Sequence, residues 1–184
     1  MDRLAKKRLA PAERQHARIG GMVELALALN GDSAAAPPSH ILENLDSEMA
    51  LRIVAGAPHS IYAEVWHAAF WQEITLEWLR GVETPCPERA ALGFPSEEQV
   101  RAESWADLCR RFLAGAEKAA TIANCTDTEN VVVCPSPAGK PARKMTVRDQ
   151  LESLAAHNAY HLGRVVLLRQ ILGSWPPPSG GFTW

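Results

Sequence analysis

Two histidines near the end of the chain, His157 and His161, are four positions apart in the segment LAAHNAYHLG. On an α-helix this spacing places both side chains on one face, with Cβ atoms about 5–6 Å apart. Two imidazoles in that arrangement can bind one metal ion, although a usable site needs at least one further ligand. A pair of this spacing also occurs in helices that bind no metal, where each ring forms hydrogen bonds in the core. The pair alone therefore leaves metal binding and core packing open.

A third histidine, His67, lies far upstream in another segment with a helical apolar pattern. Each of the three lies on the apolar stripe of its segment, which is the face expected to be buried. Burying neutral imidazoles is unfavourable unless each finds a hydrogen-bond partner or a metal. Three such ligands suit divalent zinc, nickel, iron or manganese and leave coordination positions open for water or substrate. The remaining histidines are expected outside this group: His16, His40 and His59.

Four segments with a helical period must position these side chains, and no segment shows the sustained alternation of a strand. The expected helices span residues 11–30, 60–80, 96–123 and 146–172. A short helical turn is expected within 41–53, and residues 131–133 are expected to form a brief extended piece. The sequence therefore predicts an all-α protein, a four-helix bundle. Its long first and third connections favour a non-sequential crossover topology over a plain up-and-down order.

Capping residues mark the expected helix starts. Ser60 precedes the second helix, and Ser96 with Gln99 and Thr146 with Asp149 form capping-box patterns before the third and fourth. The chain of 184 residues is expected to be a single domain. Residues 1–10 are expected to be disordered, and residues 174–184 to form an irregular tail because prolines and glycines interrupt any helix there.

The composition excludes several classes of function. Lys plus Arg number 19 against 21 for Asp plus Glu, and the formal charge of -2 gives no general basis for binding nucleic acid. No apolar segment is long enough to span a membrane, and the N-terminus has no apolar block of a secretory signal, so we expect a cytoplasmic protein. The cysteines form no C-x-x-C pair and are expected to be free thiols: Cys86, Cys109, Cys125 and Cys134.

Several motifs together resemble one known family. They are APHSI at 57–61, followed by Trp66-His67; TVR at 146–148; HNAYHLG at 157–163; LGSWPPP at 172–178; and GGFTW at 180–184. The chain is similar, over about residues 11–184, to the DinB/YfiT-like superfamily of metal-binding four-helix bundles. The resemblance implies a divalent metal held by His67, His157 and His161. Characterised relatives include transferases and isomerases that use low-molecular-weight thiols such as bacillithiol, mycothiol or glutathione, and homodimers are common in the family.

One position departs from the family pattern. Many relatives carry Gln after the H-x-x-x-H-x-G motif, whereas this chain carries Arg164. Arg164 could hold a substrate carboxylate beside the metal, reach solvent, or contact a neighbouring carboxylate. Glu64, three residues before His67, could accept a hydrogen bond behind a ligand or act as a general base, but its helical position could equally face outward. Glu64 and Arg164 are therefore the candidate catalytic residues.

Three functions fit these features. The first is a metal-dependent enzyme, a thiol S-transferase or a hydrolase, in which zinc or nickel, or else iron or manganese, activates a thiol or water against a small-molecule substrate. The second is a non-catalytic stress or interaction protein with a structural ion. The third is a metal-free helical bundle that works through its surface, for instance as a homodimer. The three inward histidines favour the first two over the third.

Overall fold

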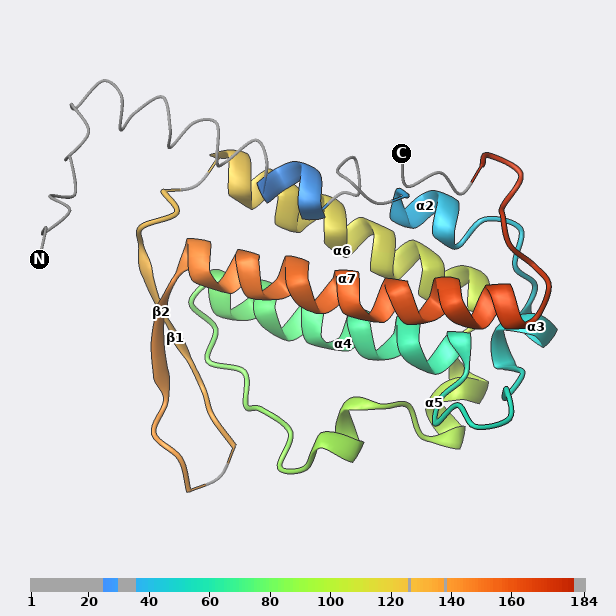
Figure 1. Ribbon diagram of the computed structural model, residues 1–184. Helices are drawn as coiled ribbons and strands as arrows, with labels where there is room; N and C mark the ends of the chain where they lie inside the picture. The colour runs from blue at the N-terminus through green and yellow to red at the C-terminus, as the bar shows by residue number, and fades with distance from the viewer. Residues whose placement is uncertain (1–24, 30–35, 126, 138, 181–184) are drawn as a thin grey trace, which may run out of the picture.

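Three long helices form the body of the protein. A computed structural model describes residues 25–29, 36–125, 127–137 and 139–180. Helix α4 (Ile61–Leu79) packs against both α6 (Trp105–Cys125) and α7 (Val147–Ile171), and the three run side by side (Figure 1). The described residues are mainly helical, as predicted.

Of the expected first helix, residues 11–30, the structure describes only 25–29, and these five residues are helical. Residues 1–10 and the last four residues of the tail also lie outside them. The four-helix bundle and its crossover topology therefore stay predictions.

Two of the long helices begin and end where the sequence predicts. The Ser60 hydroxyl accepts a hydrogen bond from the backbone nitrogen of Ala63 at 3.2 Å and caps α4. Thr146 and Asp149 form a reciprocal capping box at the start of α7, with distances of 3.0 and 3.1 Å. Helix α7 ends at Ile171 before Gly173, whose φ of 70° is a conformation that glycine tolerates best. These caps set where α4 and α7 begin.

The prediction of one helix over 96–123 is wrong, because the chain forms α5 (Glu97–Ala102) and α6 with a break at Glu103 and Ser104. Glu103 has extended backbone angles, φ -122° and ψ 122°. Ser104 then begins a second helix, since its hydroxyl accepts a hydrogen bond from the backbone nitrogen of Asp107 at 3.1 Å. A second capping signal, Ser104 with Asp107, therefore interrupts the continuous helical period inside the apolar pattern.

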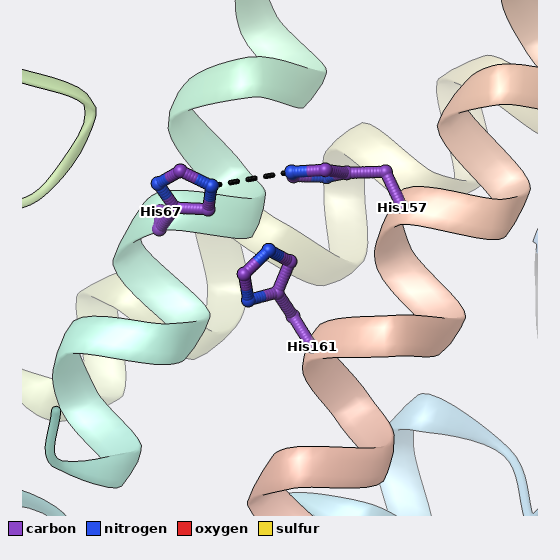
Figure 2. A group of neighbouring side chains, drawn as sticks. All are labelled: His67, His157 and His161. Atoms are coloured by element: carbon purple, nitrogen blue, oxygen red, sulfur yellow. Dashed lines mark hydrogen bonds between the residues drawn. The ribbon is translucent and has the colours of Figure 1, made fainter. Parts of the chain in front are cut away.

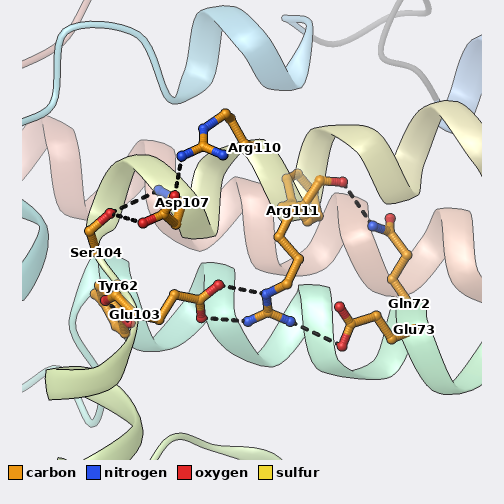
Figure 3. A network of polar contacts seen from close by, with 9 residues as sticks. Tyr62, Gln72, Glu73, Glu103, Ser104, Asp107, Arg110 and Arg111 are labelled. Atoms are coloured by element: carbon orange, nitrogen blue, oxygen red, sulfur yellow. Dashed lines mark hydrogen bonds and ion pairs between the residues drawn. The ribbon is translucent and has the colours of Figure 1, made fainter.

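A polar network holds this break against α4 (Figure 3). The hydroxyl of Tyr62 donates to the carbonyl oxygen of Glu103 at 2.9 Å. The Glu103 carboxylate accepts two hydrogen bonds from Arg111, at 2.7 and 2.8 Å, and Arg111 also pairs with Glu73 of α4 at 3.1 Å. Backbone and side-chain contacts together therefore fix the angle between α5 and α6.

The expected helical turn within 41–53 is present as α3 (Ser47–Leu51), and another short helix, α2 (Pro38–Ile41), precedes it and was not predicted. Asn44 lies between them with a φ of 53°, a left-handed conformation that interrupts a helix and that asparagine tolerates. Leu42 and Leu45 of this region are buried and Met49 packs against the main core, whereas Ile53 is 65% exposed. The chain from Leu42 to Met49 therefore lies against the core, and Ile53 does not.

A two-stranded hairpin is the departure from an all-helical chain. Strand β1 (Val131–Cys134) pairs antiparallel with β2 (Arg143–Thr146), with Val131 opposite Thr146 and Cys134 opposite Arg143. The brief extended piece at 131–133 is confirmed. Its partner strand, RKMT, has no apolar alternation and was not predicted; it is held by backbone pairing and leads directly into α7.

A short 3-10 helix, η1 (Ala90–Gly93), lies in the loop that follows α4. The main core lies where α4 meets α6 and α7, and its fully buried side chains include Tyr62, Leu108, Phe112 and Val165. Within the described residues, no helix combines the length and apolar character needed to cross a membrane.

Candidate metal centre

The three predicted histidines meet between two helices. His67 projects from α4, and His157 and His161 project from successive turns of α7 toward it (Figure 2). One ring nitrogen from each lies within 4.8 Å of the others. His67 is 9% exposed and His161 is 6% exposed, so the group lies at the inner edge of the core. The side chains are therefore close enough to share one ion.

Hydrogen bonds behind the rings fix which nitrogens face the shared space. Nδ1 of His67 lies 2.8 Å from the carbonyl oxygen of Gly93, and Nδ1 of His161 lies 2.7 Å from a carboxylate oxygen of Glu64. Because both partners only accept, each Nδ1 carries the proton, and Nε2 of each neutral ring keeps a free lone pair. Carbonyl and carboxylate acceptors of this kind orient histidines that bind metals.

The spacing of the facing nitrogens suits a metal. Nε2 of His157 lies 3.2 Å from Nε2 of His67. Two imidazole nitrogens on one tetrahedral zinc, each at about 2.0–2.1 Å from the ion, lie about 3.3 Å apart. Without an ion, His157 must donate to His67, because the proton of His67 is on the other nitrogen. The donor set therefore fits a divalent ion without rearrangement of this pair.

Burial favours the neutral, ligating form of two of the rings. Burial lowers the pKa of His67, with a smaller contribution in the same direction from His161. Burial also lowers the pKa of His157 to about 4, the neighbouring His161 and His67 add to the effect, and the Asn158 side chain acts in the opposite direction. Neutral imidazole is the form that binds metal ions.

Glu64 lies behind the histidines, fully buried, so its side chain faces inward and not toward solvent. One carboxylate oxygen accepts from His161 and the other accepts from Nε of Arg164 at 2.8 Å. Burial alone would raise the pKa of this carboxyl, but the hydrogen bond from His161 and the charge of Arg164 outweigh it and lower the pKa. Glu64 is therefore a carboxylate that fixes His161 from behind.

Of the three environments open to Arg164 in the sequence, the structure places it on a neighbouring carboxylate, that of Glu64. Its guanidinium also donates to the hydroxyl of Tyr160 at 3.3 Å. The same carboxylate accepts from both Arg164 and His161. Arg164 therefore helps to hold Glu64 in place, and through Glu64 the His161 ring.

Two residues of this site could not be predicted from the sequence. Gly93 supplies the carbonyl behind His67, and the Phe94 ring stacks on the His67 ring with centroids 4.1 Å apart. A Cβ on Gly93 would lie 3.3 Å from the His67 ring, so glycine permits this close approach. His59, which was expected outside the histidine group, stacks on Phe94 with ring centroids 3.8 Å apart. These contacts join a loop to a helix and leave no signal in local spacing.

A small pocket of about 110 Å³ opens beside His157. Trp71 and Trp78 of α4, Arg143 of β2 and Ser153 of α7 contribute to its walls. Within the ranges that the structure describes, no fourth His, Cys, Asp or Glu joins the three histidines as a ligand. An ion held by them could therefore reach a small molecule from the side of His157.

The other candidate groups lie elsewhere. His40 lies on α2 outside the group, and His16 is outside the described residues. All four cysteines are free thiols, as predicted. Burial raises the pKa of Cys86 and Cys134, and raises that of Cys109 to about 12, so these three are protonated and poorly nucleophilic at neutral pH.

Comparison with known proteins agrees with this geometry. No curated protein and no solved structure gave a significant match to the chain. The sequence profile of the DinB superfamily matches residues 38–165, a span that contains all three histidines, Glu64 and Arg164. Since this match covers well over half of the chain, the protein belongs to the DinB superfamily.

Proposed function

We propose that the protein binds one divalent metal ion through Nε2 of His67, His157 and His161 and acts as a metal-dependent enzyme, a thiol S-transferase or a hydrolase. The observation that carries the proposal is the pair of Nε2 atoms 3.2 Å apart, one of them on a ring whose Nδ1 is fixed by a backbone carbonyl. Zinc and nickel suit three neutral nitrogens best, and iron and manganese are also compatible.

The residues around the histidines would have distinct roles. Glu64 holds the proton of His161 on Nδ1 and so keeps Nε2 available. Arg164 keeps Glu64 ionised within the core. A bound divalent ion would lower the pKa of a coordinated thiol or water and so supply a nucleophile at neutral pH. The pocket beside His157 is large enough for only a small group, which fits a thiol or the reacting end of a substrate.

The alternative is a non-catalytic metal-binding stress or interaction protein with a structural ion. The burial of His67 and His161 favours it, since structural ions are usually closed off from solvent. The two functions differ in one property: a catalytic ion keeps a coordination position open, and a structural ion does not.

Finer features of the fold and setting belong to the same proposal. We infer that the first helix completes a four-helix bundle with the crossover topology, and that the protein is a cytoplasmic homodimer that uses a low-molecular-weight thiol and binds no nucleic acid. Support comes from the family and from the sequence pattern of residues 11–30. Light scattering of the purified protein tests the dimer.

Cobalt substitution separates the enzyme from the structural alternative. The Co²⁺-loaded protein would be titrated with glutathione and, separately, with 2-mercaptoethanol while its visible and near-ultraviolet spectrum is recorded. An open position predicts a new sulfur-to-cobalt charge-transfer band that saturates with thiol. The His40→Ala variant is the matched control and should give the same band. A spectrum that thiols leave unchanged, from a protein that still holds cobalt, would support the structural ion.

A further inference from the structure

Two buried side-chain atoms have no hydrogen-bond partner in the described part of the chain, and they belong to neighbouring residues. They are Nδ1 of His157, one of the three histidines, and Oδ1 of Asn158, the next residue on α7. Buried polar atoms are almost always paired, because an unpaired one loses its hydration without compensation. Two such atoms on adjacent residues therefore suggest a hydrogen bond between their side chains.

The Asn158 side chain is held in one orientation from behind. Nε2 of Gln72 donates to the carbonyl oxygen of Phe112 at 2.8 Å, as the Gln72 amide reaches from α4 toward α6 (Figure 3). Oε1 of Gln72 accepts from Nδ2 of Asn158 at 3.0 Å. Because a backbone carbonyl only accepts, this contact fixes the orientation of both amides. The free atom of Asn158 is therefore its oxygen, an acceptor.

The two amides are also tightly enclosed. Gln72 is 0% exposed and Asn158 is 4% exposed. A Cβ on Gly115 of α6 would lie 2.0 Å from Nε2 of Gln72, so a glycine is needed at this position to make room for the amide. Oδ1 of Asn158 therefore has little freedom to find a partner elsewhere.

The single proton of a neutral imidazole explains why both atoms are unpaired. Nε2 of His157 lies 3.2 Å from Nε2 of His67, whose own proton is on Nδ1, facing Gly93. His157 therefore donates from Nε2, and its Nδ1 is left as an acceptor. Nδ1 of His157 and Oδ1 of Asn158 are then both acceptors and cannot form a hydrogen bond with each other. A neutral ring that binds an ion through Nε2 carries its proton on Nδ1 instead.

We propose that Asn158, oriented by Gln72, is the acceptor that holds the Nδ1 proton of His157 when Nε2 of that ring binds the metal ion. The inference rests on the metal binding proposed above. It pairs both unpaired atoms with one hydrogen bond. Asn158 and Gln72 are then positioning residues, since neither contacts the ion and both act through His157.

Two further observations support this role. Burial lowers the pKa of His157, and the Asn158 side chain opposes this lowering, as an acceptor close to the ring does. With Asn158 included, each of the three histidines has an acceptor behind Nδ1, as Gly93 serves His67 and Glu64 serves His161. All three rings then present the lone pair of Nε2 to the shared space.

The alternative is that Asn158 only holds α4 and α7 together. That structural role depends on Nδ2, which donates to Gln72, whereas the positioning role depends on Oδ1. Two substitutions separate the atoms. Asn158→Asp keeps an acceptor oxygen and loses the donor, and Asn158→Leu loses both at similar volume.

Zinc affinity, measured by competition with a chromogenic chelator, tests the proposal. Asn158→Leu should bind zinc about 10-fold more weakly or worse, the usual effect of losing the group that orients a histidine ligand. Asn158→Asp should lose less than about threefold, because a carboxylate is a strong acceptor for Nδ1–H. Gln170→Leu removes an exposed amide from the same helix and should bind zinc like the wild type. Unchanged affinity in Asn158→Leu, or an equal loss in Asn158→Asp, would overturn the proposal.

The zinc-loaded wild type gives a second readout that does not depend on the folding of any variant. Long-range ¹H–¹⁵N spectra of the histidine rings distinguish a protonated nitrogen from a metal-bound one. His157 should carry its proton on Nδ1, and that proton should exchange slowly with solvent because Asn158 accepts it. A proton on Nε2 of His157, or rapid exchange from Nδ1, would contradict the role of Asn158. A wild type that binds no zinc would instead contradict the metal centre itself.

Discussion

Helix α7 carries two buried polar clusters that are satisfied in different ways. The histidine cluster comprises His67, His157, His161, Glu64 and Arg164, and two of its ring nitrogens face each other at 3.2 Å. The Arg169 cluster, two turns further on, joins Arg169 to backbone carbonyls. Nη1 of Arg169 donates to Ile41 at 2.5 Å, and Nη2 and Nε donate to Ser174 at 2.7 and 3.2 Å.

The difference distinguishes a candidate metal site from a cluster that only holds the fold together. Arg169 is 1% exposed, and burial lowers its pKa. Its guanidinium nevertheless donates hydrogen bonds to backbone carbonyls and lies 5.5 Å from the Trp175 ring centroid. The cluster holds α2 and the chain after α7 against the helix, and its guanidinium has no lone pair with which to bind a metal. In the histidine cluster, Nδ1 of His67 and Nδ1 of His161 donate to Gly93 and Glu64, so the lone pairs of these two rings are on Nε2, facing the shared space. Buried nitrogens that keep a lone pair therefore distinguish the candidate metal site from the Arg169 cluster.

The largest effect is expected in the Arg169 cluster. Arg169→Leu should lower the free energy of unfolding by about 3 kcal/mol, because it leaves the carbonyls of Ile41 and Ser174 without their donors in the core. Urea unfolding followed by circular dichroism measures this. Arg101→Leu, which removes an exposed ion pair with Glu97, is the control and should change stability by less than about 1 kcal/mol. The folded Arg169→Leu protein should keep its metal; loss of metal would mean that the two clusters are not independent.

The next effect belongs to the histidine cluster. Glu64→Gln should weaken metal binding about 10- to 100-fold, because the neutral amide holds the proton of His161 less firmly on Nδ1. Competition with a chromogenic chelator gives the affinity. Glu48→Gln removes an exposed carboxylate paired with Arg52 and should bind metal like the wild type. Equal affinity of Glu64→Gln and wild type would make Glu64 a packing residue only.

A change at the start of α7 should affect both clusters together. Thr146→Ala removes the cap that accepts from Asp149 and should cost about 1 kcal/mol of stability. Because α7 carries both clusters, the loss should appear in urea unfolding with no selective loss of metal affinity in the folded protein. A drop in metal affinity comparable to that of Glu64→Gln would show that the cap positions the histidines directly.

The smallest effect is a gain between the two clusters. Gly163→Ala should raise the free energy of unfolding by about 0.5–1 kcal/mol, since alanine favours the helix and its Cβ meets no atom within 4 Å. Thermal unfolding gives the sign. Metal affinity should not change, and a loss of stability would indicate a close contact at Gly163 that the described residues do not make.

The comparison also explains what the sequence could and could not predict. Helical periodicity placed His67, His157 and His161 on inward faces, because that pattern is local to α4 and α7. The pairing of Glu64 with His161 and Arg164 depends on how α4 and α7 are aligned, so spacing alone left Glu64 facing either way. Gly93 and Phe94 reach the site from a loop, and Arg169 is a basic residue in the last turn of α7, a position that does not by itself indicate burial. Contacts between distant segments decide these residues.

Metal analysis tests the central claim most directly. Protein purified without a histidine tag would be analysed for bound metals by mass spectrometry, beside His157→Ala/His161→Ala and the control His40→Ala. The account predicts about one divalent ion per chain in the wild type and in His40→Ala, and almost none in the double variant. A wild type without stoichiometric metal, or a double variant that retains its ion, would contradict it.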